Sequence, residues 1–203
     1  YLLYRTKLKL AGSGSLPSPG ARLLLRCSWP IFLSGLVGYL YTHLDRIMLG
    51  AMSGTQEVGV YAAASRIFEF AFFLPTALIH SLVPRLASEV SENGAVSREI
   101  FLKAGTALGI VGIVVNLAMA LGSWPTMQLL YGPSYAGSAS VLAILSFSML
   151  PLSLGRLRNA SWVAMGSQIH VLHSSVFGLI SNAGLNYILI PSLGAIGAAL
   201  ATT

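Results

Sequence analysis

Charged residues are scarce in this chain of 203 residues. Only 9% of the residues are Asp, Glu, Lys or Arg, against about 25% in an ordinary soluble domain, while 55% are hydrophobic. A soluble domain of this size needs a polar surface that these residues cannot supply. The composition therefore predicts that most of the protein surface faces lipid.

Several kinds of functional site are also missing from the sequence. The single cysteine, Cys27, excludes an internal disulfide. No phosphate-binding loop, zinc-ligand spacing or nucleophile elbow occurs. The formal charge is +6, but the basic residues lie between apolar blocks and not in a stripe with aromatic residues, which argues against a nucleic-acid partner. We expect no catalytic residues, no metal site and no cofactor, and leave open a coupling ion, H⁺ or Na⁺.

Long apolar segments make up most of the sequence. Five of them are long enough to cross a hydrocarbon core of about 30 Å as helices. They cover residues 29–49, 58–86 and 104–124, the stretch from 138 to beyond Arg158, and residues 171–190, and a sixth begins at 195. Pro151 predicts a kink in the fourth segment. The fold class predicted is all-α, a polytopic transmembrane helix bundle with about five full spanning helices plus the start of a sixth.

Polar stretches separate these segments and predict the connections. The expected turns and loops are residues 50–57, 87–99, 125–138, 166–170 and 191–194. The third of these contains Tyr131 and Tyr135, which suit aromatic anchors at a membrane interface.

The first 28 residues differ from the rest of the chain. They carry five basic residues and no acid around the Gly/Ser/Pro-rich stretch AGSGSLPSPG, which predicts a flexible basic linker over residues 1–28. Residues 29–203 form the predicted bundle. Residue 1 is Tyr and not Met, and the chain stops just as another apolar segment begins, so we expect a piece of a longer protein with an incomplete bundle.

Basic residues are distributed unevenly between the predicted connections. If the linker is cytoplasmic, ten of the twelve basic residues flank the inner side, and the outer turns hold none. The inner residues are Arg5, Lys7, Lys9, Arg22, Arg26, Arg85, Arg98, Lys103, Arg156 and Arg158. The positive-inside rule therefore predicts a multi-pass protein of the cytoplasmic membrane with residues 1–28 inside the cell.

Four charged residues interrupt the first two apolar segments: Asp45, Arg46, Arg66 and Glu69. A charge at the centre of a spanning helix costs about 2.5–3.5 kcal/mol on insertion scales, so such groups persist when they are paired or face water. A tight hairpin places Asp45 and Arg66 at similar depths, which predicts a pair between them. Arg66 and Glu69 are also three residues apart, within ion-pair reach, and Arg46 can extend its head toward the outer interface.

Polar residues recur at helical spacing on three of the segments. Tyr41 lies on such a stripe of the first segment, and Asn182 and Asn186 lie on one of the fifth. These stripes predict the walls of a water-filled cavity. They are also consistent with packing faces, where small and polar residues allow helices to approach closely.

The succession of motifs resembles a known family. SWPIFLSGLVGYLYTHLDRIMLG and EVGVYAAASRIFEFAFFLPTALIHSLVPRLA are followed in order by LYGPSYAGSASVLAILS and NAGLNYILIPSLGAIGAALATT. Together they resemble the start of the C-terminal half of Wzx-type flippases, in the polysaccharide-transport branch of the multidrug, oligosaccharidyl-lipid and polysaccharide exporter superfamily. The resemblance covers about residues 22–203.

This resemblance implies a transporter of two six-helix bundles, of which this chain is the second, lacking most of its last helix. Such proteins move undecaprenyl-pyrophosphate-linked oligosaccharides across the cytoplasmic membrane by alternating access. The implied partners are the lipid bilayer, the lipid-linked oligosaccharide and the chain's own N-terminal bundle. The resemblance also places Arg156 and Arg158 in the inner half of a kinked helix, where they can face the cavity.

Three functions remain after these observations. A flippase suits a cavity rich in arginine, because its cargo carries an anionic pyrophosphate. A multidrug or cation antiporter of the same superfamily would depend on the carboxylates, Asp45 and Glu69. A membrane-embedded glycosyltransferase needs an acidic cluster at a membrane face, which this sequence does not contain. The balance of charge favours the flippase.

Overall fold

The structure of the protein is a computed structural model that describes residues 21–203, with the side chains of residues 21–27, 30 and 31 left out. The regular elements of this part of the chain are all helices, which confirms the all-α part of the predicted fold class. Its elements are α2 (Ala21–Met52), α3 (Thr55–Asn93), α4 (Arg98–Tyr131), the 3₁₀-helix η1 (Pro133–Tyr135), α5 (Gly137–Phe147), α6 (Met149–Ala164), α7 (Gln168–Leu193) and α8 (Ala195–Thr202). Most of the linker predicted over residues 1–28 lies outside the described residues, and its last eight residues belong to α2.

Three of the helices, α3, α4 and α7, are long and apolar enough to cross a membrane by themselves. The bent pair formed by α5 and α6 passes the same test as a fourth span. α3, α4 and α7 correspond to the second, third and fifth apolar segments of the sequence, and the α5–α6 pair corresponds to the fourth. The described residues therefore contain three or four candidate spans, where the sequence predicted five.

The helices extend further than the apolar segments predicted. α3 continues to Asn93, where Gly94 adopts a left-handed conformation (φ 76°) and its N–H bonds to the carbonyl of Val90, a common way to end a helix. α4 begins after Ser97, whose hydroxyl accepts a hydrogen bond from the N–H of Ile100. It then passes through Pro125, so the turn expected from residue 125 begins only after Tyr131.

The predicted kink lies one turn before Pro151. α5 and α6 meet at Ser148 with a bend of 42°. A proline cannot donate a hydrogen bond to the carbonyl four residues earlier, and its ring clashes with that carbonyl, here that of Phe147. The N–H of Ser148 accordingly bonds to the carbonyl of Leu145, three residues back. Pro151 therefore accounts for the break in the fourth segment.

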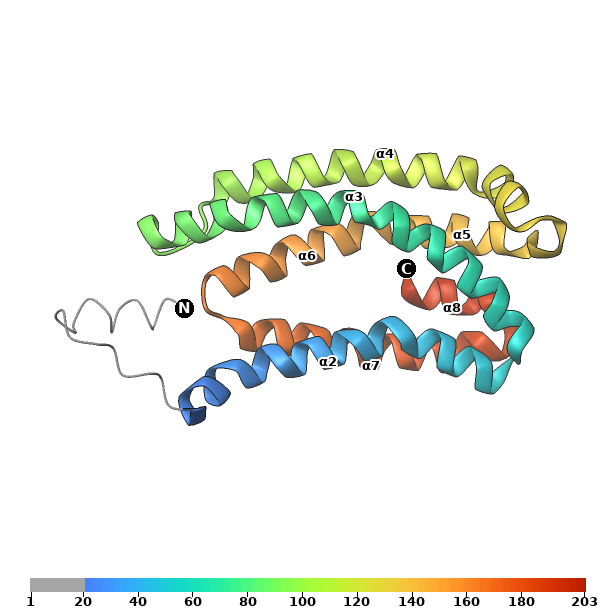
Figure 1. Cartoon of the computed structure of the whole chain (residues 1–203), viewed down its shortest axis with the longest axis horizontal. Helices are drawn as coiled ribbons and strands as arrows, with labels where there is room; N and C mark the ends of the chain where they lie inside the picture. Colours follow the sequence, from blue (N-terminus) through green and yellow to red (C-terminus); the bar gives the residue numbers. More distant parts are fainter. Residues whose placement is uncertain (1–20) are drawn as a thin grey trace.

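The helices form two groups that converge at one end and separate at the other (Figure 1). α3, α4, α5 and α6 pack together in one group, and α2 packs along α7 in the other. α8 lies between the groups near the end where they converge. The connections from α3 to α4 and from α6 to α7 lie at the open end, and those from α2 to α3 and from α7 to α8 lie at the closed end (Figure 1).

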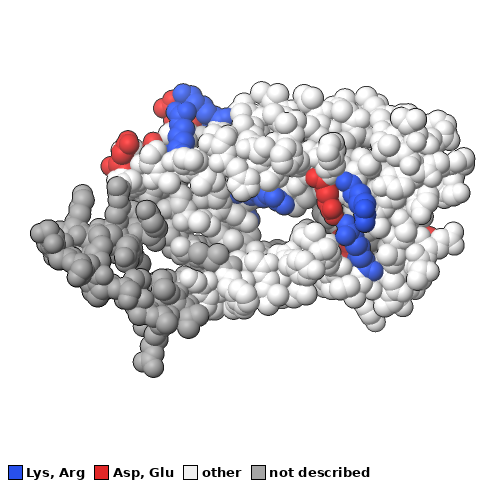
Figure 2. All heavy atoms as spheres, viewed as in Figure 1, with Lys and Arg blue, Asp and Glu red and all other residues white. Residues whose placement is uncertain are grey.

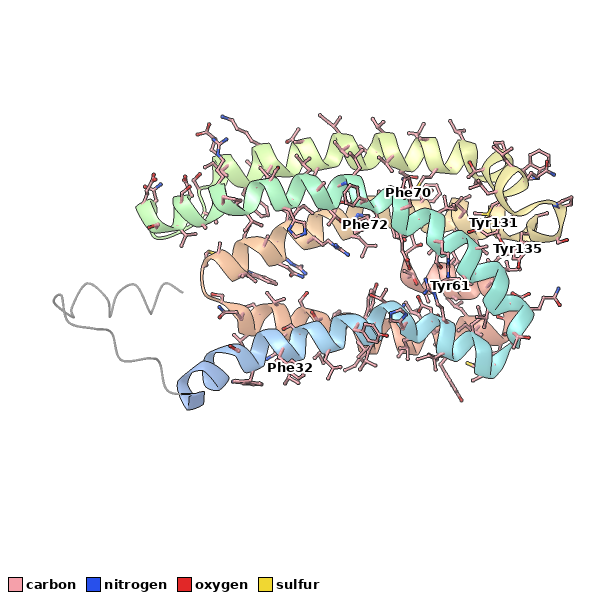
Figure 3. The ribbon with its side chains drawn as sticks, viewed as in Figure 1. Phe32, Tyr61, Phe70, Phe72, Tyr131 and Tyr135 are labelled. Carbon is pink, nitrogen blue, oxygen red and sulfur yellow. The ribbon has the colours of Figure 1, made fainter. Side chains whose placement is uncertain are left out.

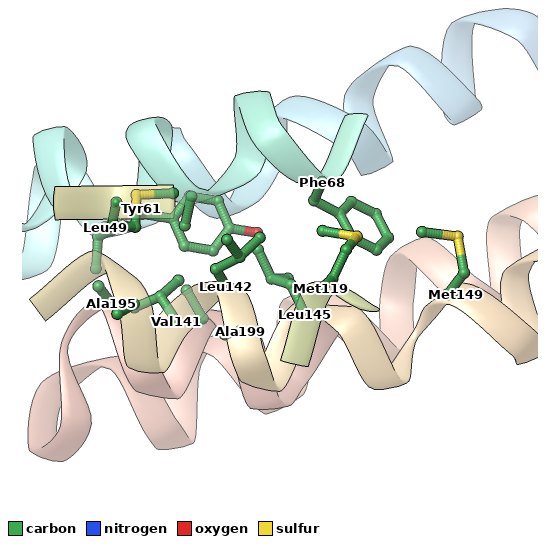
Figure 4. Packing of buried hydrophobic residues seen from close by; sticks show 14 of the residues in the cluster. Leu49, Tyr61, Phe68, Met119, Val141, Leu142, Leu145, Met149, Ala195 and Ala199 are labelled. Atoms are coloured by element: carbon green, nitrogen blue, oxygen red, sulfur yellow. The ribbon is translucent and has the colours of Figure 1, made fainter. Parts of the chain in front are cut away.

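Two apolar clusters hold the bundle together. The larger one lies toward the closed end and contains Leu49, Tyr61, Leu142 and Met149, with small alanines of α8 (Figure 4). The smaller one joins α3, α4 and α6. Large apolar side chains also cover the outside, as Phe70, 82% exposed, illustrates (Figure 3). Such an exterior is what a lipid environment requires and water would not favour.

Close packing between α7 and α8 generates a prediction about stability. A Cβ added at Gly197 would overlap the backbone of Leu189 in α7, whereas one added at Gly184 would meet nothing. Because backbone cannot move aside as a flexible side chain can, we expect Gly197→Ala to destabilise the protein by about 1–3 kcal/mol. Gly184→Ala is the matched control. A thermal unfolding midpoint of Gly197→Ala equal to that of the control would contradict this packing.

Candidate functional site

A cavity of about 530 Å³ lies between the two groups of helices. The space-filling view shows it as a hollow with basic and acidic atoms near its edge, on a face that is otherwise largely uncharged (Figure 2). Its polar and charged lining comes from five helices. These residues are Tyr41, Thr42, Asp45 and Arg46 of α2, Tyr61, Ser65 and Glu69 of α3, Arg156, Arg158 and Asn159 of α6, Ser174 and Ser175 of α7, and Thr202 of α8, with Thr203 after it.

Asp45 forms the polar centre at the closed end of this cavity. Its side chain is 3% exposed. One carboxylate oxygen accepts hydrogen bonds from the Tyr61 hydroxyl and the Thr202 hydroxyl, both at 2.8 Å, and the other accepts one from the Asn186 amide at 2.6 Å. Tyr61, which extends from α3 (Figure 3), thus bonds to a carboxylate of α2. The carboxylate thus joins α2, α3, α7 and α8.

A second layer of amides supports this carboxylate. The Asn186 amide also donates to the Oδ1 of Asn182 at 3.0 Å, and Asn182 donates to the carbonyl of Ala201 at 3.4 Å. The two asparagines are therefore buried behind the cavity wall and not on its surface. The oxygens of Asp45 are thus engaged by one amide donor and two hydroxyl donors. Within residues 21–203, no group of three His, Cys, Asp or Glu residues could hold a metal ion.

The ion pairs of the cavity differ from those the sequence predicted. Arg46 pairs with Glu69, Nη2 to Oε1, at 2.6 Å. Asp45 has neutral partners, and Arg66 is an exposed side chain that does not line the cavity. The predicted pair between Asp45 and Arg66 is therefore wrong, and Glu69 bonds across to α2 and not to Arg66. The reason is rotation about the α3 axis, because Arg66, five residues after Tyr61, points about 140° away from it.

Arg156 and Arg158 face the cavity from α6 without a carboxylate partner in the described part of the chain. The guanidinium of Arg156 lies 4.5 Å from the ring centre of Phe72 and donates to the Thr76 hydroxyl at 3.3 Å. Arg158 lies 4.7 Å from the ring centre of Trp162 and donates to Ser174 at 2.6 Å. Aromatic faces attract cations without neutralising them, so both charges stay available to a ligand.

The structure brings together most of the residues singled out from the sequence. Tyr41, Asp45, Arg46, Glu69, Arg156 and Arg158 line the cavity, whereas Arg66, Asn182 and Asn186 do not. Sequence reasoning missed Asn159 and Thr202. Asn159 follows the predicted Arg158 directly and could have been included, but Thr202 gave no signal, because its contact with Asp45 joins residues 157 positions apart.

The environment of Asp45 predicts the effect of replacing it. Asp45→Asn removes the charge that three donors share, and a hydrogen bond to a charged group contributes about 1.5–3 kcal/mol. We expect a clear loss of folded protein, measured by size-exclusion chromatography and thermal unfolding. Arg66→Gln alone should leave folding unchanged, and adding it to Asp45→Asn should restore nothing. Recovery in that double variant would show that Asp45 and Arg66 interact after all.

Comparisons with known proteins agree with this architecture. Residues 1–90 match the family described as polysaccharide biosynthesis protein. The chain is 32% identical over 182 residues to "Probable flippase AglR" of Haloferax volcanii, an alignment that covers 86% of this chain and 38% of the relative. It is 26% identical over 194 residues to "Probable low-salt glycan biosynthesis flippase Agl15" of the same organism, covering 94% of this chain and 41% of the relative.

A bacterial relative extends the pattern. "Capsular polysaccharide biosynthesis protein CapF" of Staphylococcus aureus is 24% identical over 176 residues, covering 86% of this chain and 44% of the relative. The chain thus spans about two fifths of the length of these relatives. No solved structure matches it significantly. The apolar helices are those of a membrane protein. The family match and these relatives place the chain in the polysaccharide biosynthesis protein family, which includes the Wzx-like flippases that its sequence resembles.

Proposed function

We propose that this chain is the C-terminal bundle of a transporter that moves lipid-linked oligosaccharides across the cytoplasmic membrane. In this proposal α2, α3, α4, the α5–α6 pair and α7 are five spanning helices, and α8 begins a sixth. Residues 1–28 connect the bundle to a preceding one, which completes the cavity from the opposite side. The cargo is an oligosaccharide linked through pyrophosphate to undecaprenol, and the relatives named as flippases support this class.

One observation carries the proposal, namely that two arginines of α6 face the cavity and have no carboxylate partner among the described side chains. An unpaired charge between spanning helices is costly unless it faces water or a ligand. Guanidinium groups bind phosphate oxygens through two parallel hydrogen bonds. Arg156 and Arg158 are two such groups on one wall, and the Asn159, Ser174 and Ser175 side chains beside them suit sugar hydroxyls.

The alternative, a cation antiporter of the same superfamily, depends on the two carboxylates of the cavity. Asp45 is occupied by three hydrogen-bond donors, and Glu69 is paired with Arg46. A cationic substrate could therefore reach only Glu69, and only in competition with an arginine. The three arginines of the lining also repel such a substrate. An enzymatic function has no support from the cavity, whose two carboxylates come with no further acid.

The proposed orientation places the open end of the bundle in the cytoplasm. The connections that carry Arg85, Arg98 and Lys103 lie at that end, as does the connection after α6 (Figure 1). The turns without basic residues lie at the opposite end. The cavity then opens toward the side on which a lipid-linked oligosaccharide is made and is closed toward the side on which it is released.

Cysteine labelling tests this orientation. Ser134, in η1 at the closed end, and Ser91, near the end of α3 at the open end, are both exposed. In intact cells that express the intact protein, an impermeant thiol reagent should label Ser134→Cys. It should label Ser91→Cys only after the membrane is permeabilised. The opposite pattern would reverse the proposed orientation.

Charge removal tests the proposed cargo. We expect Arg156→Gln and Arg158→Gln each to weaken cargo binding roughly tenfold or more, because each loses a charged hydrogen-bond donor. The measurement is surface polysaccharide in cells, divided by the amount of membrane-inserted protein. Arg85→Gln, an exposed arginine outside the cavity, is the matched control. The double variant Arg156→Gln/Arg158→Gln is also measured. If it exports polysaccharide normally, or if its drug susceptibility changes while export does not, the antiporter is favoured.

A further inference from the structure

The Arg46–Glu69 pair is unusual among the charges of the cavity, because its two members come from different helices and both face the ligand space. We propose that Glu69 is an internal substitute for the cargo's diphosphate, which occupies Arg46 until an anionic ligand displaces it. This inference rests on the proposed function and adds a residue-level binding site to it. The ligand is a diphosphate, and Arg46 is the residue that binds it once Glu69 has been displaced.

The first support is that Glu69 uses only part of the Arg46 guanidinium. The pair is joined through Nη2 alone, at 2.6 Å, and the Nε of Arg46 is buried without a hydrogen-bond partner among the described residues. A guanidinium can offer Nε and an Nη together to one oxyanion as a fork. Glu69 leaves this fork incomplete. Because the Nε is buried, we expect a phosphate group to complete the fork only by entering where the carboxylate now lies.

The second support is the exposure of the two side chains. Glu69 is 52% exposed and Arg46 26% exposed, so the carboxylate can leave for water while the guanidinium stays in place. Ion pairs between exposed groups are weak, because water screens them and ordering the side chains costs entropy. The carboxylate is therefore a partner that a stronger anion can replace.

The third support is a second guanidinium at the same level of α3. Phe72 follows Glu69 by three residues and lies on the same face of the helix, and Arg156 lies over its ring. Arg46 and Arg156 thus approach a single turn of α3 from opposite walls of the cavity. An anion that takes the place of Glu69 would lie between them, with a guanidinium on either side.

Competition with Glu69 also provides selectivity. A monovalent anion such as chloride or acetate brings no more charge than the carboxylate that it would replace, whereas a diphosphate brings more charge and more acceptor oxygens. Discrimination of this kind works by opposing the wrong ligand as well as by attracting the right one. Displacement also breaks the Arg46–Glu69 bond between α2 and α3 and leaves the bond between Tyr61 and Asp45 in place, so cargo entry and the loss of one of these contacts become one event.

The test measures pyrophosphate binding to the intact protein in lipid nanodiscs by isothermal titration calorimetry. Glu69→Gln removes the competitor, so we expect inorganic pyrophosphate to bind about three- to tenfold more tightly than to the wild type. This gain in affinity depends on Arg46, so the double variant Arg46→Gln/Glu69→Gln should bind pyrophosphate no more tightly than Arg46→Gln does. Glu92→Gln, which removes an exposed acid at the far end of α3, controls for net charge and should change nothing. Glu69→Ala repeats the measurement should the glutamine variant fold poorly.

Several results would overturn the inference. One is that both Glu69→Gln and Glu69→Ala bind pyrophosphate no more tightly than the wild type does. Another is that Glu69→Gln increases the affinity for pyrophosphate equally when Arg46 is already replaced by Gln. A third is that Glu92→Gln increases this affinity as much as Glu69→Gln does. If Arg156→Gln weakens binding while Glu69→Gln has no effect, the inference fails and the proposed function stands. If no variant changes pyrophosphate binding, both fail. The same titrations are repeated with undecaprenyl pyrophosphate and with undecaprenol. If Glu69→Gln binds undecaprenyl pyrophosphate more tightly than the wild type does, and binds undecaprenol no more tightly, the lipid-linked diphosphate is identified as the ligand.

Discussion

The arrangement of the bundle depends on one buried carboxylate. Asp45 lies in an apolar protein in lipid, where an unsatisfied charge is very unfavourable, and it takes its three hydrogen bonds from three other helices. These bonds are satisfied only when α2, α3, α7 and α8 meet at one depth and with the right faces inward. Apolar packing between membrane-spanning helices specifies the relative depth and rotation of the helices less strictly. The polar cluster therefore specifies where the two groups of helices converge, and the apolar cluster around Leu49 and Met149 fills the same end.

The cavity follows from this convergence. Once the helices are joined at one end, the bend near Pro151 and the oblique path of α3 let the two groups separate toward the other (Figure 1). The cavity walls carry the polar faces of five helices, while the large apolar side chains point outward. A cavity lined in part by arginine thus exists within a bundle whose exterior suits lipid. This combination supports the proposed movement of a polar, anionic group across a hydrocarbon core.

The charges in the cavity are held in three different ways, and the differences carry functional meaning. Asp45 is fully hydrogen-bonded and has a structural position, whereas Arg46 is paired with a partner that water can reach. Arg156 and Arg158 rest on aromatic rings and keep their charge. In the proposed function, the groups available to an anion therefore lie toward α6 and not at the closed end of the cavity.

The sequence by itself determined the helices, because apolar length and the scarcity of charge are properties of local stretches. It also determined the break near Pro151, since the missing N–H acts within one turn. Six of the nine candidate residues line the cavity. Charges within apolar segments identified Asp45, Arg46 and Glu69, a polar stripe identified Tyr41, and the family resemblance identified the two arginines of α6. Only the tertiary structure decided the partners. Depth along a helix can be counted in the sequence, but rotation about its axis and the crossing of α2 and α3 come from packing. For that reason Asp45 binds Tyr61, Asn186 and Thr202 and not Arg66, and Glu69 binds Arg46.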